Sequence, residues 1–136
     1  MSTEHVWAWG VPRILVVDDY PQAAECLARW LKTFGHDVET ATDGEQALES
    51  AERFRPEVIF LDIAMPKLNG YEVATKIREQ PWGKKIFLVA LTASSDPERS
   101  RKAGFDAHIV KPAFPAEITS LLGSYFRRTP RVGTLA

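Results

Sequence analysis

Five side chains in this sequence have the chemistry to handle a phosphoryl group, and each stands where an apolar run ends. Asp18 and Asp19 follow "RILVV", Asp62 follows "EVIFL", Thr92 follows "IFLVAL", and Lys111 follows "AHIV". A carboxylate next to a core is costly to desolvate, so it needs a partner or a chemical role. Three carboxylates together repel one another, and a hard cation such as Mg²⁺ offsets that repulsion. A lysine and a hydroxyl suit phosphate oxygens. These residue types indicate a phosphoryl group held beside Mg²⁺, with Asp62 as a possible nucleophile.

Short apolar runs alternate with segments of helical periodicity along the whole chain. We expect strands over residues 13–17, 36–41, 57–61, 86–91 and 107–110. We expect helices over residues 21–34, 43–53, 71–79, 96–103 and 115–126.

Several residues indicate where these helices begin and end and which of their faces is buried. Ala24, Leu27, Ala28 and Leu31 form an inward stripe on the first helix, on which Cys26 either fills the core or belongs to the exposed face. Asp43 and Gln46 resemble a capping box, while Asp96 with Pro97 resembles a cap followed by a first turn. Gly35 and Gly104 are placed to close helices.

This alternation is a β–α unit repeated five times, which predicts one α/β domain with a parallel sheet covered by helices on both faces. The carboxyl ends of parallel strands meet at one rim, and functional groups gather there in open α/β sheets. The five side chains named above are therefore expected to converge. Taken singly, each of these residues also has a structural explanation. Thr92 could be a residue that favours a strand, and Lys111 could be a surface lysine. Asp18 and Asp19 could belong to a solvated turn or cap a helix.

The composition is that of an ordinary globular protein. The 136 residues are 45% hydrophobic and 26% charged, and 17 Lys and Arg against 18 Asp and Glu give a net charge of −1. This balance gives no reason to expect direct nucleic-acid binding or membrane insertion. The start lacks the pattern of a signal peptide, and the single cysteine fits a reducing compartment, so we expect a cytoplasmic protein.

Four quoted segments together resemble the receiver domain of two-component response regulators. They are "VVDD" (16–19), "FLDIAMPKLNGYE" (60–72), "ALTA" (90–93) and "GFDAHIVKP" (104–112), and the resemblance covers residues 12–126. It implies a flavodoxin-like, doubly wound (βα)5 sheet with strand order 2-1-3-4-5. It leaves residues 1–11 as an N-terminal extension and residues 127–136 as a flexible tail.

The resemblance also implies roles for the site residues. Asp62 would accept a phosphoryl group from a histidine kinase or a histidine phosphotransfer protein. Asp19 and Asp62 would ligate Mg²⁺ with the backbone carbonyl of Ala64, and Asp18 would act through water. Thr92 and Lys111 would contact the phosphoryl oxygens, and the peptide bond before Pro112 would be cis. Such a domain is not an enzyme, apart from self-phosphorylation by small donors and self-dephosphorylation at Asp62.

A receiver responds by moving its threonine and a switch aromatic residue, which changes the surface of the last two βα units. The threonine is Thr92, but the aromatic position holds His108, a smaller and titratable side chain. Tyr20 also departs from the common pattern by placing a large side chain near the site. Ala64 offers no side chain to orient an attacking water.

The partners of such a domain are expected on two surfaces. Kinase recognition is expected at the first helix and the Lys111–Phe114 loop; the helix candidates are Gln22, Ala23, Cys26 and Arg29. A homodimer, if formed, is expected to use the last helix and the fifth strand. The ten residues after Phe126 are too few for an output domain. We therefore expect a stand-alone receiver acting on a downstream protein, or the receiver of a hybrid kinase.

Three other functions fit parts of the pattern. A flavin-binding carrier of the same fold needs a hydroxyl- and glycine-rich loop where this chain has "DDYPQ". An aspartate-nucleophile hydrolase has two acids spaced by one residue and a cap domain, which this length does not accommodate. A receiver-like interaction module that is never phosphorylated remains the main alternative.

Overall fold

The structure is a computed structural model that describes the backbone of residues 12–94 and 96–128 and the side chains as far as Tyr125. The expected N-terminal extension, residues 1–11, lies outside the described residues. The expected tail was residues 127–136; residues 127 and 128 belong instead to the last helix, and the rest lies outside the described residues. The strands are β1 (Arg13–Val17), β2 (Asp37–Ala41), β3 (Val58–Asp62), β4 (Phe87–Thr92) and β5 (Ala107–Val110). The helices are α2 (Pro21–Lys32), α3 (Gly44–Phe54), α4 (Gly70–Glu79), α5 (Pro97–Ala103) and α6 (Pro115–Arg128), with a 3-10 turn, η1 (Pro81–Gly83).

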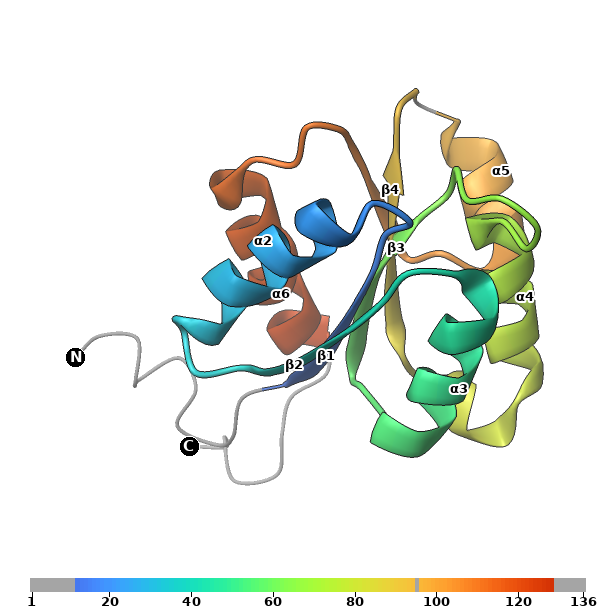
Figure 1. Cartoon of the computed structure of the whole chain (residues 1–136), viewed down its shortest axis with the longest axis horizontal. Coiled ribbons are helices and arrows are strands. Elements are labelled where there is room, and N and C mark those ends of the chain that lie inside the picture. Colours follow the sequence, from blue (N-terminus) through green and yellow to red (C-terminus); the bar gives the residue numbers. More distant parts are fainter. Residues whose placement is uncertain (1–11, 95, 129–136) are drawn as a thin grey trace.

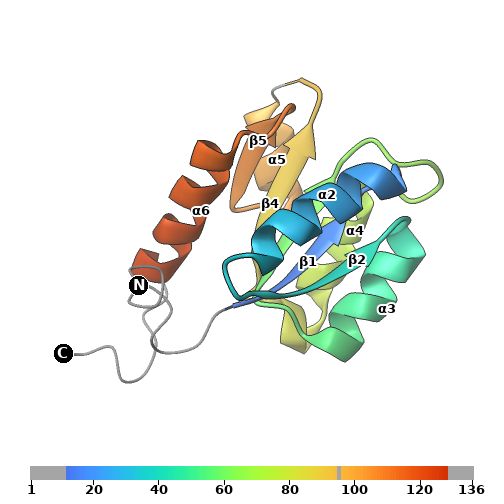
Figure 2. The ribbon, with the colours of Figure 1, turned by 60° about the vertical axis from the view of Figure 1, so that its left-hand side comes forward.

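The five strands form one parallel sheet in the order β2-β1-β3-β4-β5, which confirms the expected fold and strand order. Figure 1 shows α2 and α6 on one face of the sheet and α3, α4 and α5 on the other. The turned view in Figure 2 shows the same three layers. In a doubly wound sheet of this kind, the carboxyl ends of β1, β3, β4 and β5 all lie at the same end of the sheet.

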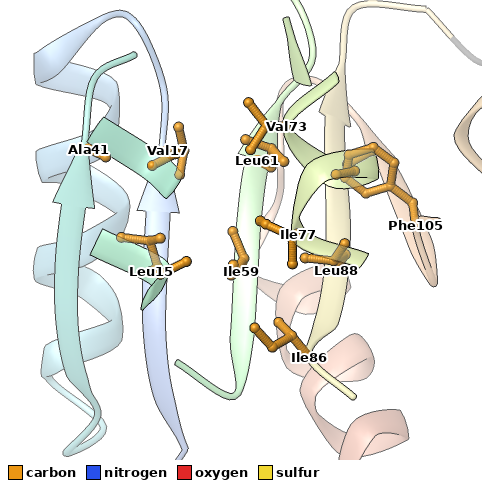
Figure 3. Packing of buried hydrophobic residues seen from close by; sticks show 14 of the residues in the cluster. Leu15, Val17, Ala41, Ile59, Leu61, Val73, Ile77, Ile86, Leu88 and Phe105 are labelled. Carbon is orange, nitrogen blue, oxygen red and sulfur yellow. The ribbon is translucent and has the colours of Figure 1, made fainter. Parts of the chain in front are cut away.

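Two hydrophobic clusters hold the layers together, one on each face of the sheet. Leu15 and Val17 of β1 and Ile59 and Leu61 of β3 pack toward α3 and α4, as Figure 3 shows. The alternate strand residues, such as Phe60, pack toward α2 and α6. Because successive strand side chains point to opposite faces, strands apolar at nearly every position are expected only where both faces are buried.

The inward stripe of α2 is as expected at Ala24, Ala28 and Leu31, which are buried, whereas Leu27 is half-buried. Cys26 is exposed, so the expectation that it fills the core is wrong. The reason is helical geometry: each residue advances by about 100°, so position 26 points away from positions 24 and 28.

The helix ends follow the expected capping residues, with one difference. Asp43 accepts the Gln46 N–H at 2.8 Å, but Gln46 Oε1 accepts the Thr42 N–H instead of completing a capping box with Asp43. A complete capping box occurs at α4, between Asn69 and Glu72, where we did not expect one. In the described parts of the chain, no helix has the length and apolar character needed to cross a bilayer.

Candidate functional site

The ends of β1 and β3 bring three carboxylates together. Val17 pairs with Leu61 in the parallel register, so Asp18 and Asp62 lie one residue further on, on neighbouring strands. Both are nearly inaccessible, at 4% and 3% exposure, while Asp19 is exposed. One oxygen from each of the three carboxylates lies within 4.8 Å of the others. The predicted convergence of these acids is therefore present.

Lys111, which follows β5, places a positive charge beside the carboxylates of Asp18 and Asp62. Lys111 Nζ lies 3.2 Å from Asp18 Oδ2 and 3.5 Å from Asp62 Oδ1, so one ammonium group contacts both buried acids. The Lys111 N–H also donates to the carbonyl oxygen of Thr92 at 2.7 Å, which fixes the end of β5 to the end of β4. The peptide bond from Lys111 to Pro112 is cis, as the resemblance implied.

The electrostatics of the site are shaped first by burial. Burial raises the pKa of Asp62 to about 6; the negative charge of Asp18 adds to this, and the positive charge of Lys111 opposes it. Burial alone would lower the pKa of Lys111, but the charges of Asp62 and Asp18 together outweigh it and raise that pKa. In the absence of a further cation, the site therefore holds more negative charge than Lys111 balances.

Backbone N–H groups orient the two buried carboxylates. Asp62 Oδ1 accepts the Ala64 N–H at 3.2 Å, and Asp18 Oδ1 accepts the Tyr20 N–H at 3.0 Å. Behind the strand end, a Cβ added to Gly70 would lie 2.6 Å from the carbonyl oxygen of Asp62, so only glycine permits α4 to start this close. The loop after β3 therefore sets the position of Asp62 from both sides.

Thr92 is buried at the end of β4, and its hydroxyl is engaged within its own loop. It donates to the carbonyl oxygen of Ser94 at 2.7 Å and accepts the Ser94 N–H at 3.2 Å. His108 is half-buried and pairs in register with Ala90, two residues before Thr92. It lines a groove of about 340 Å³ between β5 and α6, together with residues such as Leu121.

The donor set suits a hard divalent cation. All three side chains offer carboxylate oxygens, which Mg²⁺ prefers, and the exposed Asp19 leaves the site open to water ligands. The side chains that could hold Mg²⁺ are therefore the three carboxylates of Asp18, Asp19 and Asp62.

A second hollow, of about 480 Å³, adjoins the site between α2 and the start of α6. Asp18 and Lys111 lie at its polar end. Its other lining residues are Ala23, Cys26, Leu27, Trp30, Leu91, Ala113, Pro115 and Ile118. Ala23 and Cys26 were expected on a docking surface, whereas Gln22 and Arg29 are not part of this lining. Trp30 was missed, although its spacing from Ala23 and Cys26 along one helix could have indicated it.

Two exposed aromatic residues stand in the loops beside this hollow. Tyr20, in the loop before α2, is 61% exposed, and Phe114, in the loop before α6, is 59% exposed. Large apolar side chains this exposed, next to an apolar hollow, are typical of protein contact surfaces.

Comparison with known proteins gives consistent matches. A family model described as "Response regulator receiver domain" matches residues 14–122. The chain is 36% identical over 121 residues to the alkaline phosphatase synthesis transcriptional regulatory protein PhoP of Bacillus subtilis (strain 168). That alignment covers 86% of this chain and 49% of PhoP, so the chain spans about half the length of this relative.

Two solved structures are similar over most of the chain. Chemotaxis protein CheY4 of Vibrio cholerae has a TM-score of 0.80 and 30% identity, covering 85% of this chain and 99% of that one. The receiver domain of the sensor histidine kinase PA1611 of Pseudomonas aeruginosa PAO1 has a TM-score of 0.77 and 32% identity, covering 85% of this chain and 98% of that one. The PA1611 structure is described as having a magnesium ion coordinated in its active site cleft.

Proposed function

This chain belongs to the response regulator receiver family of two-component signalling, and from that membership we propose that Asp62 is its phosphoacceptor. The observation that carries the proposal is the meeting of Asp62 with Asp18, Asp19 and Lys111 at the ends of three strands. The donor is a phosphohistidine on a kinase or on a histidine phosphotransfer protein. Phosphorylation of Asp62 then changes how the domain contacts a downstream protein.

The transfer step uses one carboxylate oxygen of Asp62. That oxygen attacks phosphorus as the phosphorus–nitrogen bond of the donor breaks, and the imidazole leaves with the bonding electron pair. Lys111 Nζ, 3.5 Å from Asp62, supplies positive charge to the transferring oxygens. The Ala64 N–H holds the carboxylate in a fixed orientation during the attack.

Asp19 and Asp62 would hold Mg²⁺ together with the backbone carbonyl of Ala64, as the resemblance implies. When bound, Mg²⁺ supplies charge neutralisation between the carboxylates and the phosphoryl oxygens. Asp18 positions Lys111 at 3.2 Å, so that its ammonium group stays beside Asp62.

We place donor docking at the hollow between α2 and the start of α6. Its lining is apolar except for Asp18 and Lys111, which place its opening beside the phosphoacceptor. The exposed aromatic rings of Tyr20 and Phe114 stand in the neighbouring loops. Cys26→Arg, at an exposed position in this hollow, is expected to slow transfer from a phosphorylated protein donor while leaving acetyl phosphate unaffected. Thr75→Arg, exposed on α4 across the sheet, is the matched control and should change neither rate.

The proposal is tested by intact-mass measurement of the protein after incubation with acetyl phosphate. Wild type with Mg²⁺ is expected to gain one phosphoryl group, and this gain should be lost in Asp62→Ala and when Mg²⁺ is removed. Asp37→Ala, an exposed aspartate at the start of β2, is the control and should be phosphorylated like wild type.

The competing function is an interaction module that is never phosphorylated, favoured by His108 at the expected switch position. Absence of the mass gain, together with no response to beryllofluoride and Mg²⁺, would support that function instead. Binding to a partner that is equal for wild type and Asp62→Ala would point the same way.

A further inference from the structure

The β3–α4 loop, residues 63–69, is the part of the site that has neither helix nor strand structure. It contains Ala64, whose N–H orients the phosphoacceptor carboxylate. The Ile63 N–H donates to the carbonyl oxygen of Leu91 at 2.9 Å, and the Gly70 N–H donates to the carbonyl oxygen of Ile63 at 3.0 Å. These two bonds fix the ends of the loop, so the path between them depends on other contacts.

The middle of the β3–α4 loop has a backbone conformation that needs support. Lys67 has a φ of 66°, in the left-handed region that residues with a side chain rarely adopt. Such a conformation persists only where the surrounding structure holds it. The side chains of Pro66 and Lys67 are exposed and give little packing, whereas Leu68 is half-buried and packs against the hydrophobic cluster on this face of the sheet. The contacts of Leu68 therefore supply the support.

Leu68 lies directly against Gly44, the first residue of α3. A Cβ added to Gly44 would lie 2.7 Å from Leu68 Cβ and 2.8 Å from the carbonyl oxygen of Leu68, whereas ordinary contacts begin at 3.4 Å. Because one of these atoms belongs to the backbone, a side chain at position 44 could be accommodated only by moving the loop itself. Glycine is unfavourable in a helix, so the close approach of Leu68 explains why it is found here.

We propose that the contact between Leu68 and Gly44 sets the path of the β3–α4 loop, which makes both of them positioning residues for the phosphoryl chemistry at Asp62. The loop carries the two backbone groups of Ala64 that the site uses: the N–H that Asp62 accepts, and the carbonyl that the resemblance implies for Mg²⁺. The inference rests on the proposed function. It extends the site to α3, a helix that contributes none of the five side chains predicted to handle the phosphoryl group.

Amide hydrogen exchange, measured by NMR without metal, tests whether Gly44 sets the loop. The Gly70 N–H reports the loop, and the Ile63 N–H, which bonds to β4, reports the end of the strand before it. In Gly44→Ala, exchange at Gly70 is expected to rise about fivefold or more relative to exchange at Ile63. A variant that only destabilised the whole fold would raise both rates equally. Leu68→Ala should raise the same ratio, and it keeps the test decisive if Gly44→Ala does not fold.

Two measurements test the consequence at the site: Mg²⁺ titration followed by the Ala64 amide signal, and the rate of phosphorylation by acetyl phosphate. In Gly44→Ala and Leu68→Ala we expect weaker Mg²⁺ binding and phosphorylation slowed about tenfold or more, because small displacements of positioning groups are costly to a reaction.

The control variants lose stability without touching the β3–α4 loop. Gly35→Ala strains a left-handed backbone, with a φ of 90°, where an added Cβ would meet no other atom within 4 Å. Leu48→Ala removes a half-buried leucine that packs against the same cluster from α3. Both controls should keep the Mg²⁺ affinity and the phosphorylation rate of wild type.

Wild-type Mg²⁺ affinity and phosphorylation rate in Gly44→Ala and Leu68→Ala would overturn the inference, as would a parallel rise in exchange at Gly70 and Ile63. Failure of wild type to gain a phosphoryl group would count against the proposed function. In that case the metal-free exchange ratios would still decide whether the contact of Leu68 with Gly44 sets the loop.

Discussion

Replacing Asp62 by Asn removes a charge from a site where the folded protein disfavours it, and we expect the metal-free protein to become more stable. The Asp62 side chain is 5% exposed and lies beside Asp18, and its pKa is raised to about 6. Asparagine has nearly the same shape. Its Oδ1 still accepts the Ala64 N–H, and its Nδ2 can donate to a neighbouring carboxylate.

The size of the effect follows from the pKa. One pKa unit corresponds to about 1.4 kcal/mol. A rise from 3.8 to about 6 therefore makes ionised Asp62 destabilise the fold by at most about 3 kcal/mol. This figure already includes the attraction of Lys111 to ionised Asp62, and in the variant Lys111 keeps its contact with Asp18 at 3.2 Å. We therefore expect a gain of up to about 3 kcal/mol in the free energy of unfolding near neutral pH.

The pH dependence gives the sign of the effect independently. Asp62 is an acid with a raised pKa in the folded state, so between pH 3.8 and about 6 the folded state binds more protons than the unfolded state. Wild-type stability should therefore fall, relative to the variant, as the pH rises through this window. The difference between the two proteins should be small near the lower limit of the window and constant above its upper limit.

Urea unfolding in the presence of a chelator, over a series of pH values, measures this difference, with Asp37→Asn as a control that should match wild type within about 0.5 kcal/mol. Added Mg²⁺ should stabilise wild type more than Asp62→Asn, because the variant lacks a metal ligand. A variant that is equally stable or less stable than wild type near neutral pH would refute the view that Asp62 is held at a cost to the fold.

Three further predictions concern the scaffold. Gly70→Ala would place a Cβ 2.6 Å from the backbone oxygen of Asp62, and we expect a loss of about 1 to 3 kcal/mol in stability, measured by urea unfolding, with slower phosphorylation. Arg78→Met removes the donor to the carbonyl oxygens of Gly104 and Ile86 and one of the donors to Asp106, and a loss of about 2 to 4 kcal/mol is expected in the same assay. His36 is buried, and burial lowers its pKa below 6.5 in the folded state, so wild type should lose stability as the pH falls from 6.5 toward that lower value. In His36→Gln this part of the acid dependence of the melting temperature should disappear, whereas it should persist in His108→Gln.

The fold could be predicted because each strand here is buried on both faces. Runs such as residues 57–61 and 86–91 are apolar without interruption, and only a sheet covered by two helical layers buries such runs. The site could be predicted for a related reason: its side chains follow the strands directly, so strand order alone brings Asp18, Asp62 and Lys111 together. The predicted ends of the third and fourth strands are one residue too early, because the strands include Asp62 and Thr92. The apolar pattern stops at the last apolar residue, whereas the strand continues through the polar residue that follows it.

The features that sequence reasoning missed depend on contacts between distant segments. In the sequence, Arg78 cannot be distinguished from an exposed arginine on a helix. Its role appears only in the structure, where it bonds to the carbonyl oxygen of Gly104, 26 residues away. The apolar hollow beside α2 needs residues from two helices and a strand, so neither helix alone indicates it. Cys26 was expected in the core because cysteine is among the residue types most often buried, although its position on the helix points it away from Ala24 and Ala28.

The strand order has a consequence for self-association through the sheet. An open sheet leaves two strands with unpaired backbone groups on one side, here β2 and β5, and such edges are templates for aggregation. The edge at β2 is protected by charge, since its five residues include Asp37 and Glu39. The edge at β5 contains no Asp, Glu, Lys or Arg and leaves Val110 40% exposed. It is protected instead by its length of four residues and by Pro112 shortly after its end. A variant that lengthened β5, for example by replacing Pro112 with a β-branched residue, would remove that protection and expose the domain to aggregation along this edge.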